Sequence, residues 1–314
     1  MKKDVALTLS CGGARGLAHI GVIRELEARG YRIRSVAGCS IGSLIGAFLA
    51  MGKLDALELF MRSLSLDDMT DYIDFTLSEH GFIKAQRFIN KLKELAPDCP
   101  IETLPVKLSI VATNLETGKA EIFTQGSIYR AVRASIAIPI VITSVEQHGA
   151  QLVDGSVVNP LPLDLARPQE GEISVAVNLY AQGTVELPAA SPRAIRTATD
   201  MFAYLRKKLH AVRSWRTSLL QTVFNESNES TGYIGRIRSI FDLMTQRLIE
   251  KTLEAQPADI VIDIPLTAAS VFDFYRAGWL IELGRRAASK ALDHYETSSK
   301  GRFSFLYRWL RGGH

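Results

Sequence analysis

The chain has 314 residues, enough for one large α/β domain or two modest ones, and 47% of them are hydrophobic, as expected for a globular protein with a sizeable core. The formal net charge of +4 is too weak to indicate a nucleic-acid partner. Three widely spaced cysteines (Cys11, Cys39 and Cys99) match neither a metal site nor a disulfide framework. We therefore expect free thiols, no bound metal and no other cofactor.

The N-terminal segment places two lysines before apolar residues, but Asp4 interrupts the pattern and the apolar run is too short for a signal peptide. No stretch reaches the roughly 18 apolar residues that a membrane-spanning helix needs. We therefore expect a soluble, cytoplasmic protein. The sequence carries no signal for an oligomeric state.

The first part of the chain repeats one pattern twice: a β-rich run, a glycine turn and an apolar helical run. Strands are predicted over residues 4–10 and 32–38, and helices over 17–30 and 43–52. This order is typical of a parallel, doubly wound sheet. Both glycine turns then lie at the carboxyl edge of the strands, where open α/β sheets bind ligands.

The rest of the chain mixes strand and helix patterns. Amphipathic helices are predicted over 53–104, with a break at 78–82. The other expected elements are two strands within 106–124, a helix over 127–139, a strand running into a turn over 151–162, strands over 173–181 and 259–266, and a helix over 278–292.

The first motif that could carry chemistry is the stretch GCSIG, from Gly38 to Gly42. Gly-x-Ser-x-Gly between a strand and a helix fits a nucleophile elbow, whose tight turn exposes Ser40 and requires small flanking residues. The N-terminus of the following helix also favours developing negative charge. The alternative is a helix start at which Ser40 only caps a backbone amide.

The second motif is the loop SCGGARG, whose successive glycines let backbone N–H groups converge on an anion. A dinucleotide loop would need a glycine where Cys11 stands, and an acidic residue at the end of the next strand. An oxyanion hole fits better, with the amides of Gly12, Gly13 and Ala14 as donors and Arg15 adding positive charge.

The base that would activate Ser40 is less evident. None of the histidines follows a strand with suitable neighbours, as a Ser-His-Asp triad requires (His19, His80, His148, His210, His294 and His314). Asp154 stands at a predicted strand end before Gly155, and partial burial would raise its pKa and suit it to accept a proton directly from serine. The alternative is an Asp-Gly pair that only forms a turn.

Four segments in chain order carry a family resemblance: CGGARG (11–16), GCSIG (38–42), ASIAIP (134–139) and DGS (154–156). With VATNLETG (111–118) and residues 272–287, they resemble the bacterial branch of the patatin-like phospholipase family over roughly 4–181 and 232–292. Three positions depart from the family pattern: Cys11 replaces a glycine, Ser10 an acidic residue, and Ser156 a glycine or alanine.

The resemblance implies a three-layer α/β/α fold with a central, mostly parallel sheet, a helical insertion and C-terminal helices. It implies a Ser-Asp dyad in which Ser40 is the nucleophile and Asp154 the base, with the oxyanion hole at Gly12 and Gly13. The implied activity is hydrolysis of carboxylic esters of lipids. The alternatives are a short-chain carboxylesterase or thioesterase of the same mechanism, or a catalytically silent lipid-binding regulatory protein.

On this basis we expect a catalytic domain formed by residues 1–181 and 259–292. Residues 182–258 would form a helical, lid-like insertion, and residues 293–314 a basic, aromatic tail. The segments 204–220 and 302–311 combine basic with apolar and aromatic residues, as do helices at a membrane interface. Each segment could equally pack on the domain or form an oligomer contact.

We expect the side chains that line an acyl-chain site to come from residues 44–51 and 72–89. The aromatic candidates in these ranges are Phe75, Phe82 and Phe88. The alternative for each of them is an ordinary place in the hydrophobic core.

Overall fold

The computed structural model describes residues 3–65, 68, 72, 75–78, 81–139, 141–184 and 233–311. Within this part, a mixed sheet has the strand order β10-β9-β1-β2-β5-β8-β7, and β6 pairs with β5. The parallel strands are β1 (Lys3–Leu9), β2 (Tyr31–Cys39), β5 (Lys107–Asn114), β9 (Glu172–Ala181) and β10 (Ile260–Pro265). The antiparallel strands are β6 (Lys119–Phe123), β7 (Val145–Gln147) and β8 (Ala150–Asp154).

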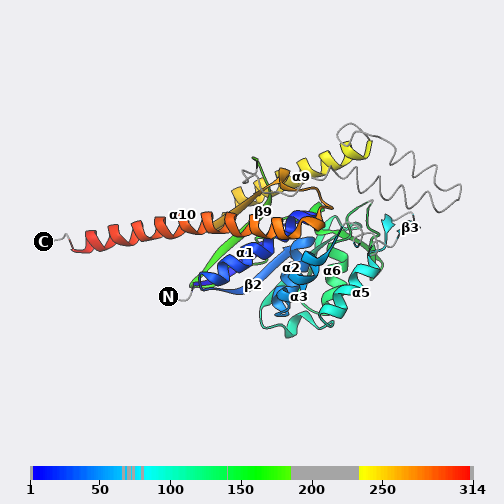
Figure 1. Ribbon diagram of the computed structural model, residues 1–314, viewed down its shortest axis with the longest axis horizontal. Coiled ribbons are helices and arrows are strands. Elements are labelled where there is room, and N and C mark those ends of the chain that lie inside the picture. The colour runs from blue at the N-terminus through cyan, green and yellow to red at the C-terminus, as the bar shows by residue number, and fades with distance from the viewer. Residues whose placement is uncertain are drawn as a thin grey trace.

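Helices surround the sheet, and Figure 1 shows α1 running alongside α10. These two helices approach closely because each has a glycine at the contact: a Cβ on Gly21 would lie 1.8 Å from the Ile281 carbonyl oxygen, and one on Gly284 would lie 1.9 Å from that of Ala18. The helices are α1 (Leu17–Ala28), α2 (Ile41–Ala50), α3 (Leu54–Ser63), α5 (Gln86–Leu95), α6 (Ile128–Ser135), α9 (Tyr233–Ala255) and α10 (Ala277–Arg311).

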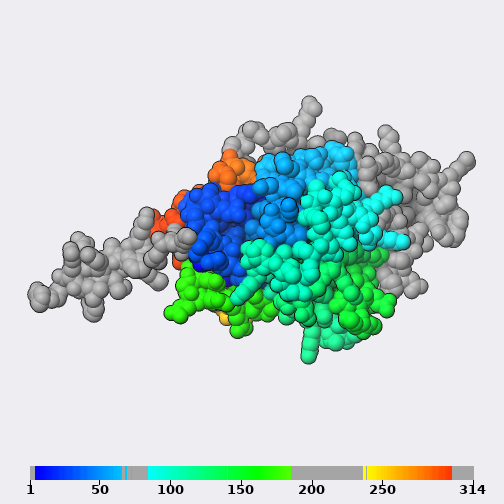
Figure 2. Space-filling model, turned by 90° about the horizontal axis from the view of Figure 1, so that it is seen from below, coloured from blue at the N-terminus to red at the C-terminus, as the bar shows by residue number. Residues whose placement is uncertain are grey.

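The predicted α/β class with a mostly parallel sheet is confirmed. The large core packs strands β1, β2 and β9 against helices α1, α2 and α10, and its inward side chains are almost fully buried. A smaller cluster places Ala166 against Ala6 of β1 and Ala37 of β2. Figure 2 shows α1 (dark blue), α3 (lighter blue) and α5 (cyan) beside one another on one face of the molecule.

The structure differs from the predicted elements, or adds to them, in three places. The break expected at 78–82 is a small hairpin of β3 (Phe75–Ser78) and β4 (Gly81–Ile83). Strand β7 was not anticipated, because three residues are too short to show a hydrophobic period. Helix α10 continues to Arg311, so residues 302–311 extend this helix. The segment 204–220 and the N-terminal part of the expected insertion lie outside the described residues.

Strand β5 aligns two other strands end to end along one edge. Val111 pairs with Cys39 of β2 on one side and with Ile122 of β6 on the other. The next residue, Ala112, pairs with Asp154 of β8 and again with β6. Because β2 runs parallel to β5 and β8 runs antiparallel to it, the carboxyl ends of β2 and β8 meet head-on.

Candidate active site

Ser40 occupies the tight turn between β2 and α2, as predicted. Its backbone has φ 55° and ψ −122°, a conformation that a residue other than glycine rarely adopts and that is found mainly at functional sites. A Cβ on Gly38 would lie 2.4 Å from the Gly42 carbonyl oxygen, and one on Gly42 would lie 2.3 Å from that of Leu9. Both glycines are therefore required by the close approach of the backbone.

The hydroxyl of Ser40 donates a hydrogen bond of 2.6 Å to Oδ2 of Asp154. The Ser40 side chain makes no capping hydrogen bond to α2, so the alternative of a simple helix cap is excluded. Its partner lies 114 residues away in sequence and reaches Ser40 because β2 and β8 end at the same point of β5. The Asp-Gly pair also forms a turn, but the carboxylate faces the serine.

Burial and hydrogen bonds fix the Asp154 carboxyl. Asp154 is 1% exposed, its amide donates to the Ala137 carbonyl (2.9 Å), and its carbonyl accepts from the Thr113 hydroxyl (2.9 Å). Oδ1 accepts from the amide of Ser156 at 2.9 Å. Burial raises the pKa of this carboxyl, while the hydrogen bonds from Ser40 and Ser156 act in the opposite direction. Gly155 is required here, since a Cβ would lie 2.4 Å from the Val111 carbonyl oxygen.

Ser135 is a site residue that was not assigned a role from the sequence. Its fully buried hydroxyl accepts from the Ser40 amide at 2.9 Å and donates to the Val111 carbonyl at 2.6 Å. It thus ties the strained turn to β5. The available signal was the segment ASIAIP, which contributed to the family resemblance without a function attached to its serine.

The glycine loop follows β1 and begins the short 3-10 helix Gly13–Gly16. One predicted donor was wrong: the amide of Ala14 donates to the Val271 carbonyl at 2.8 Å and is therefore not directed at a ligand. Within the described part of the chain, the amides of Gly12 and Gly13 have no hydrogen-bond acceptor. Gly13 has φ +57°, and a Cβ there would lie 2.6 Å from the Val271 carbonyl oxygen.

Arg15 is buried, and the contacts of its guanidinium are with residues other than Ser40 and Asp154. Its Nη1 donates to the Ala269 carbonyl at 3.1 Å, and the guanidinium lies 4.9 Å from the centre of the Tyr180 ring. These contacts attach the glycine loop to β9 and to the segment before α10. A direct role of the Arg15 charge at the oxyanion hole, as expected from the sequence, finds no support in them.

The described histidine side chains do not contact the Ser40–Asp154 pair. His19 is fully buried, and its Nε2 lies 2.9 Å from the Ser10 carbonyl oxygen. Burial lowers the pKa of His19 to about 4, so the ring is neutral at physiological pH. His148 and His294 lie on the surface. His80, His210 and His314 lie outside the described residues.

The described residues contain neither a metal-binding cluster nor a membrane-spanning helix. No group of three or more histidine, cysteine, aspartate or glutamate side chains there could hold a metal ion. No helix in the described ranges is long and apolar enough to cross a membrane.

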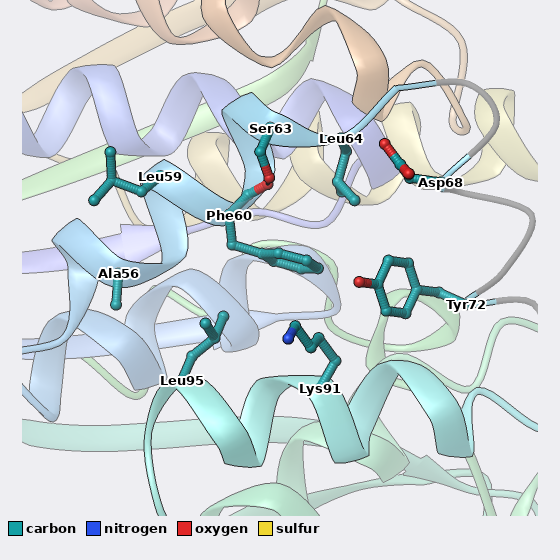
Figure 3. Close-up of a pocket in the computed structure, with 9 residues that line it drawn as sticks. All are labelled: Ala56, Leu59, Phe60, Ser63, Leu64, Asp68, Tyr72, Lys91 and Leu95. Atoms are coloured by element: carbon teal, nitrogen blue, oxygen red, sulfur yellow. The ribbon is translucent and has the colours of Figure 1, made fainter.

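A groove of about 610 Å³ lies between α3 and α5. Figure 3 shows Phe60 and Tyr72 next to one another there, with Lys91 beside them. The two rings meet edge to face, with their centres 5.5 Å apart. Ser40, Asp154 and Phe88 do not line this groove. The side chains of Phe75 and Phe82, also considered for an acyl chain, lie outside the described part of the structure. Phe48, in the other range considered, is fully buried with its ring against that of Tyr129.

Comparison with known proteins places this geometry in a family context. A family model described as patatin-like phospholipase matches residues 7–167. An uncharacterized NTE family protein of Mycobacterium tuberculosis is 29% identical over 93% of this chain and 92% of its own length. Patatin-like phospholipase domain-containing protein 6 of Homo sapiens is 30% identical over 58% of this chain, but only 14% of its own length is matched.

Two other similarities were found. A lysophospholipase NTE1 of Yarrowia lipolytica is 29% identical over 56% of this chain and 12% of its own length. The crystal structure of VipD from Legionella pneumophila has a TM-score of 0.46 at 14% identity, covering 94% of this chain and 67% of that one. Because the family model matches more than half of the residues, including Ser40, Asp154 and the glycine loop, this chain belongs to the patatin-like phospholipase family.

Proposed function

We propose that this protein hydrolyses carboxylic esters of lipids, with Ser40 as nucleophile and Asp154 as general base. The observation that carries the proposal is the 2.6 Å hydrogen bond from the Ser40 hydroxyl to Asp154 Oδ2, made by a serine in a strained turn at a helix N-terminus. A buried carboxyl with a raised pKa is a stronger base than an exposed one. Membership of the patatin-like phospholipase family supports the same chemistry.

The proposed reaction has two acyl-transfer steps. Asp154 takes the proton of Ser40 while Oγ attacks the ester carbonyl carbon, and the resulting oxyanion is stabilised by the amides of Gly12 and Gly13. Protonated Asp154 then donates to the leaving alcohol as the carbon–oxygen bond breaks. A water molecule next gives its proton to Asp154 and attacks the acyl-enzyme, and this proton returns to Ser40 as the carboxylic acid leaves.

The proposed domain organisation is the one expected from the sequence. Residues 1–181 and 259–292 would form the catalytic domain and 182–258 the lid-like insertion. Residues 293–314, which continue helix α10 as far as Arg311, would form the basic tail. The protein would be cytoplasmic and would contact the membrane surface peripherally through residues 204–220 and 302–311. Co-sedimentation with liposomes tests the tail: a chain ending after Ser299 should bind less than the full chain, and equal binding would exclude this role.

The activity is tested with p-nitrophenyl esters of graded chain length and with phospholipid and lysophospholipid substrates. We expect hydrolysis that increases with acyl-chain length and is abolished in Ser40→Ala and Asp154→Asn. A preference for the shortest esters or for thioesters would favour the alternative esterase or thioesterase. Saturable lipid binding without hydrolysis of any ester would favour the silent regulatory protein.

A further inference from the structure

The two oxygens of the Asp154 carboxyl have different partners. Oδ2 faces the hydroxyl of Ser40, at 2.6 Å. Oδ1 accepts from the amide of Ser156 at 2.9 Å and lies 3.8 Å from Sγ of Cys39, within hydrogen-bond distance for a sulfur donor. A carboxyl in this turn therefore has one oxygen for the reaction and one that is held by the protein.

Cys39 is the last residue of β2 and is fully buried beside Asp154. The head-on meeting of β2 and β8 puts the two residues side by side, since they pair with adjacent residues of β5. Gly155 leaves room for the thiol, because a Cβ there would lie 3.1 Å from Sγ. The contact thus follows from the same alignment of strands that brings Asp154 to Ser40.

We infer that Cys39 is a positioning residue for the proposed reaction: its thiol donates to Oδ1 of Asp154 and so keeps Oδ2 directed at Ser40. This inference rests on the proposed function. Burial raises the pKa of the Cys39 thiol well above its ordinary value, so the sulfur keeps its proton and serves as a donor. The same burial makes Cys39 a poor nucleophile.

Few of the described side chains near Asp154 shift the pKa of its carboxyl group. The groups that act most strongly on Asp154 are Ser40, Ser156 and Cys39, and each stabilises its charged form against the effect of burial. The nearby thiol of Cys11 raises the pKa of the Cys39 thiol in the same direction as burial does. Tyr180 likewise has a pKa well above its ordinary value because it is buried.

The test compares Cys39→Ala and Cys39→Ser with the wild-type chain. Loss of the donor destabilises the charged carboxylate, so the pKa of Asp154 rises in Cys39→Ala. We expect the acid limb of kcat/KM to move to higher pH by about half a pH unit, and kcat to fall about 3- to 10-fold. In Cys39→Ser a hydroxyl donor remains, and the acid limb should lie at or below its wild-type position.

A merely structural role for Cys39 would lower activity without moving the acid limb, and that result would overturn the inference. If Cys39→Ala fails to fold, an acid limb above the wild-type position in Cys39→Ser overturns it equally. Cys99→Ala, which changes a cysteine outside the site, serves as the control and should leave the profile unchanged.

A second readout does not depend on turnover. The carboxyl carbon of Asp154 can be titrated by NMR in protein labelled at aspartate, with Asp154→Asn identifying its signal. Its midpoint should rise in Cys39→Ala, and an unchanged midpoint would refute the contact. If no ester is hydrolysed but the midpoint rises, the proposed function fails while the contact of Cys39 with Asp154 stands.

Discussion

The hydroxyl of Ser135 can be removed without touching Ser40 or Asp154, and its loss should separate support of the turn from chemistry. In Ser135→Ala, the buried Ser40 amide loses its acceptor at 2.9 Å and the Val111 carbonyl loses a donor at 2.6 Å. A buried donor left without a partner costs about 1–3 kcal/mol. We therefore expect the free energy of unfolding to fall by about 2 kcal/mol.

Activity should fall as well, because the Ser40 backbone is held in a strained conformation that Ser135 ties to β5. A displacement of about 1 Å in a reacting group can reduce the rate roughly 100-fold. We expect kcat/KM for a p-nitrophenyl ester to fall about 10- to 100-fold. Urea denaturation followed by circular dichroism gives the stability of the same preparation.

Ser43→Ala is the matched control. Ser43 is also fully buried, and its hydroxyl donates to the Ser40 carbonyl at 2.6 Å. That carbonyl still accepts from the amides of Ser43 (2.9 Å) and Leu44 (3.2 Å), so no backbone group loses its last partner. We expect a loss of at most about 1 kcal/mol and nearly unchanged activity. Equal losses in both variants would refute the idea that Ser135 specifically supports the turn.

Three further predictions concern stability. Burial raises the folded-state pKa of Asp154 above its unfolded value, so the contribution of Asp154 to stability is favourable at low pH and is lost as pH rises through the folded pKa. Asp154→Asn should therefore be inactive yet more stable than the wild type at pH 7. In urea denaturation at several pH values, this gain in stability should vanish below about pH 3.8. Gly42→Ala should not yield soluble, folded protein, because its Cβ would lie 2.3 Å from the Leu9 carbonyl oxygen. In Gly46→Ala, a control in the same helix, the Cβ would lie 3.1 Å from a side-chain methyl group, and the free energy of unfolding should stay within about 1 kcal/mol of the wild-type value. Equal expression and equal melting temperatures of the two variants would contradict this packing argument. Burial lowers the pKa of His19 from 6.5 to about 4, so the free energy of unfolding should decrease by about 3 kcal/mol as pH falls from 6.5 toward 4. If His19→Gln shows the same pH dependence, another group is responsible.

The local chemistry of the site could be predicted from short segments of sequence. Glycines at positions 38 and 42 around Ser40, between a β-rich and a helical run, predicted a tight turn because only glycine tolerates such close backbone contacts. The strands and helices of the parallel half were also predicted well, because their hydrophobic periods can be recognised in short stretches of sequence. The hairpin of β3 and β4 and the short strand β7 have no such period and were missed.

The partners of these groups were decided by the tertiary structure. Sequence patterns left Asp154 either a base or a turn residue, and only the end-to-end placement of β2 and β8 along β5 directs its carboxylate at Ser40. The amide of Ala14 looked like that of Gly13 in the sequence, but Val271, more than 250 residues away, takes its hydrogen bond. Which donors remain free and which carboxyl is buried depends on contacts between distant segments, and no local pattern of residues records those contacts.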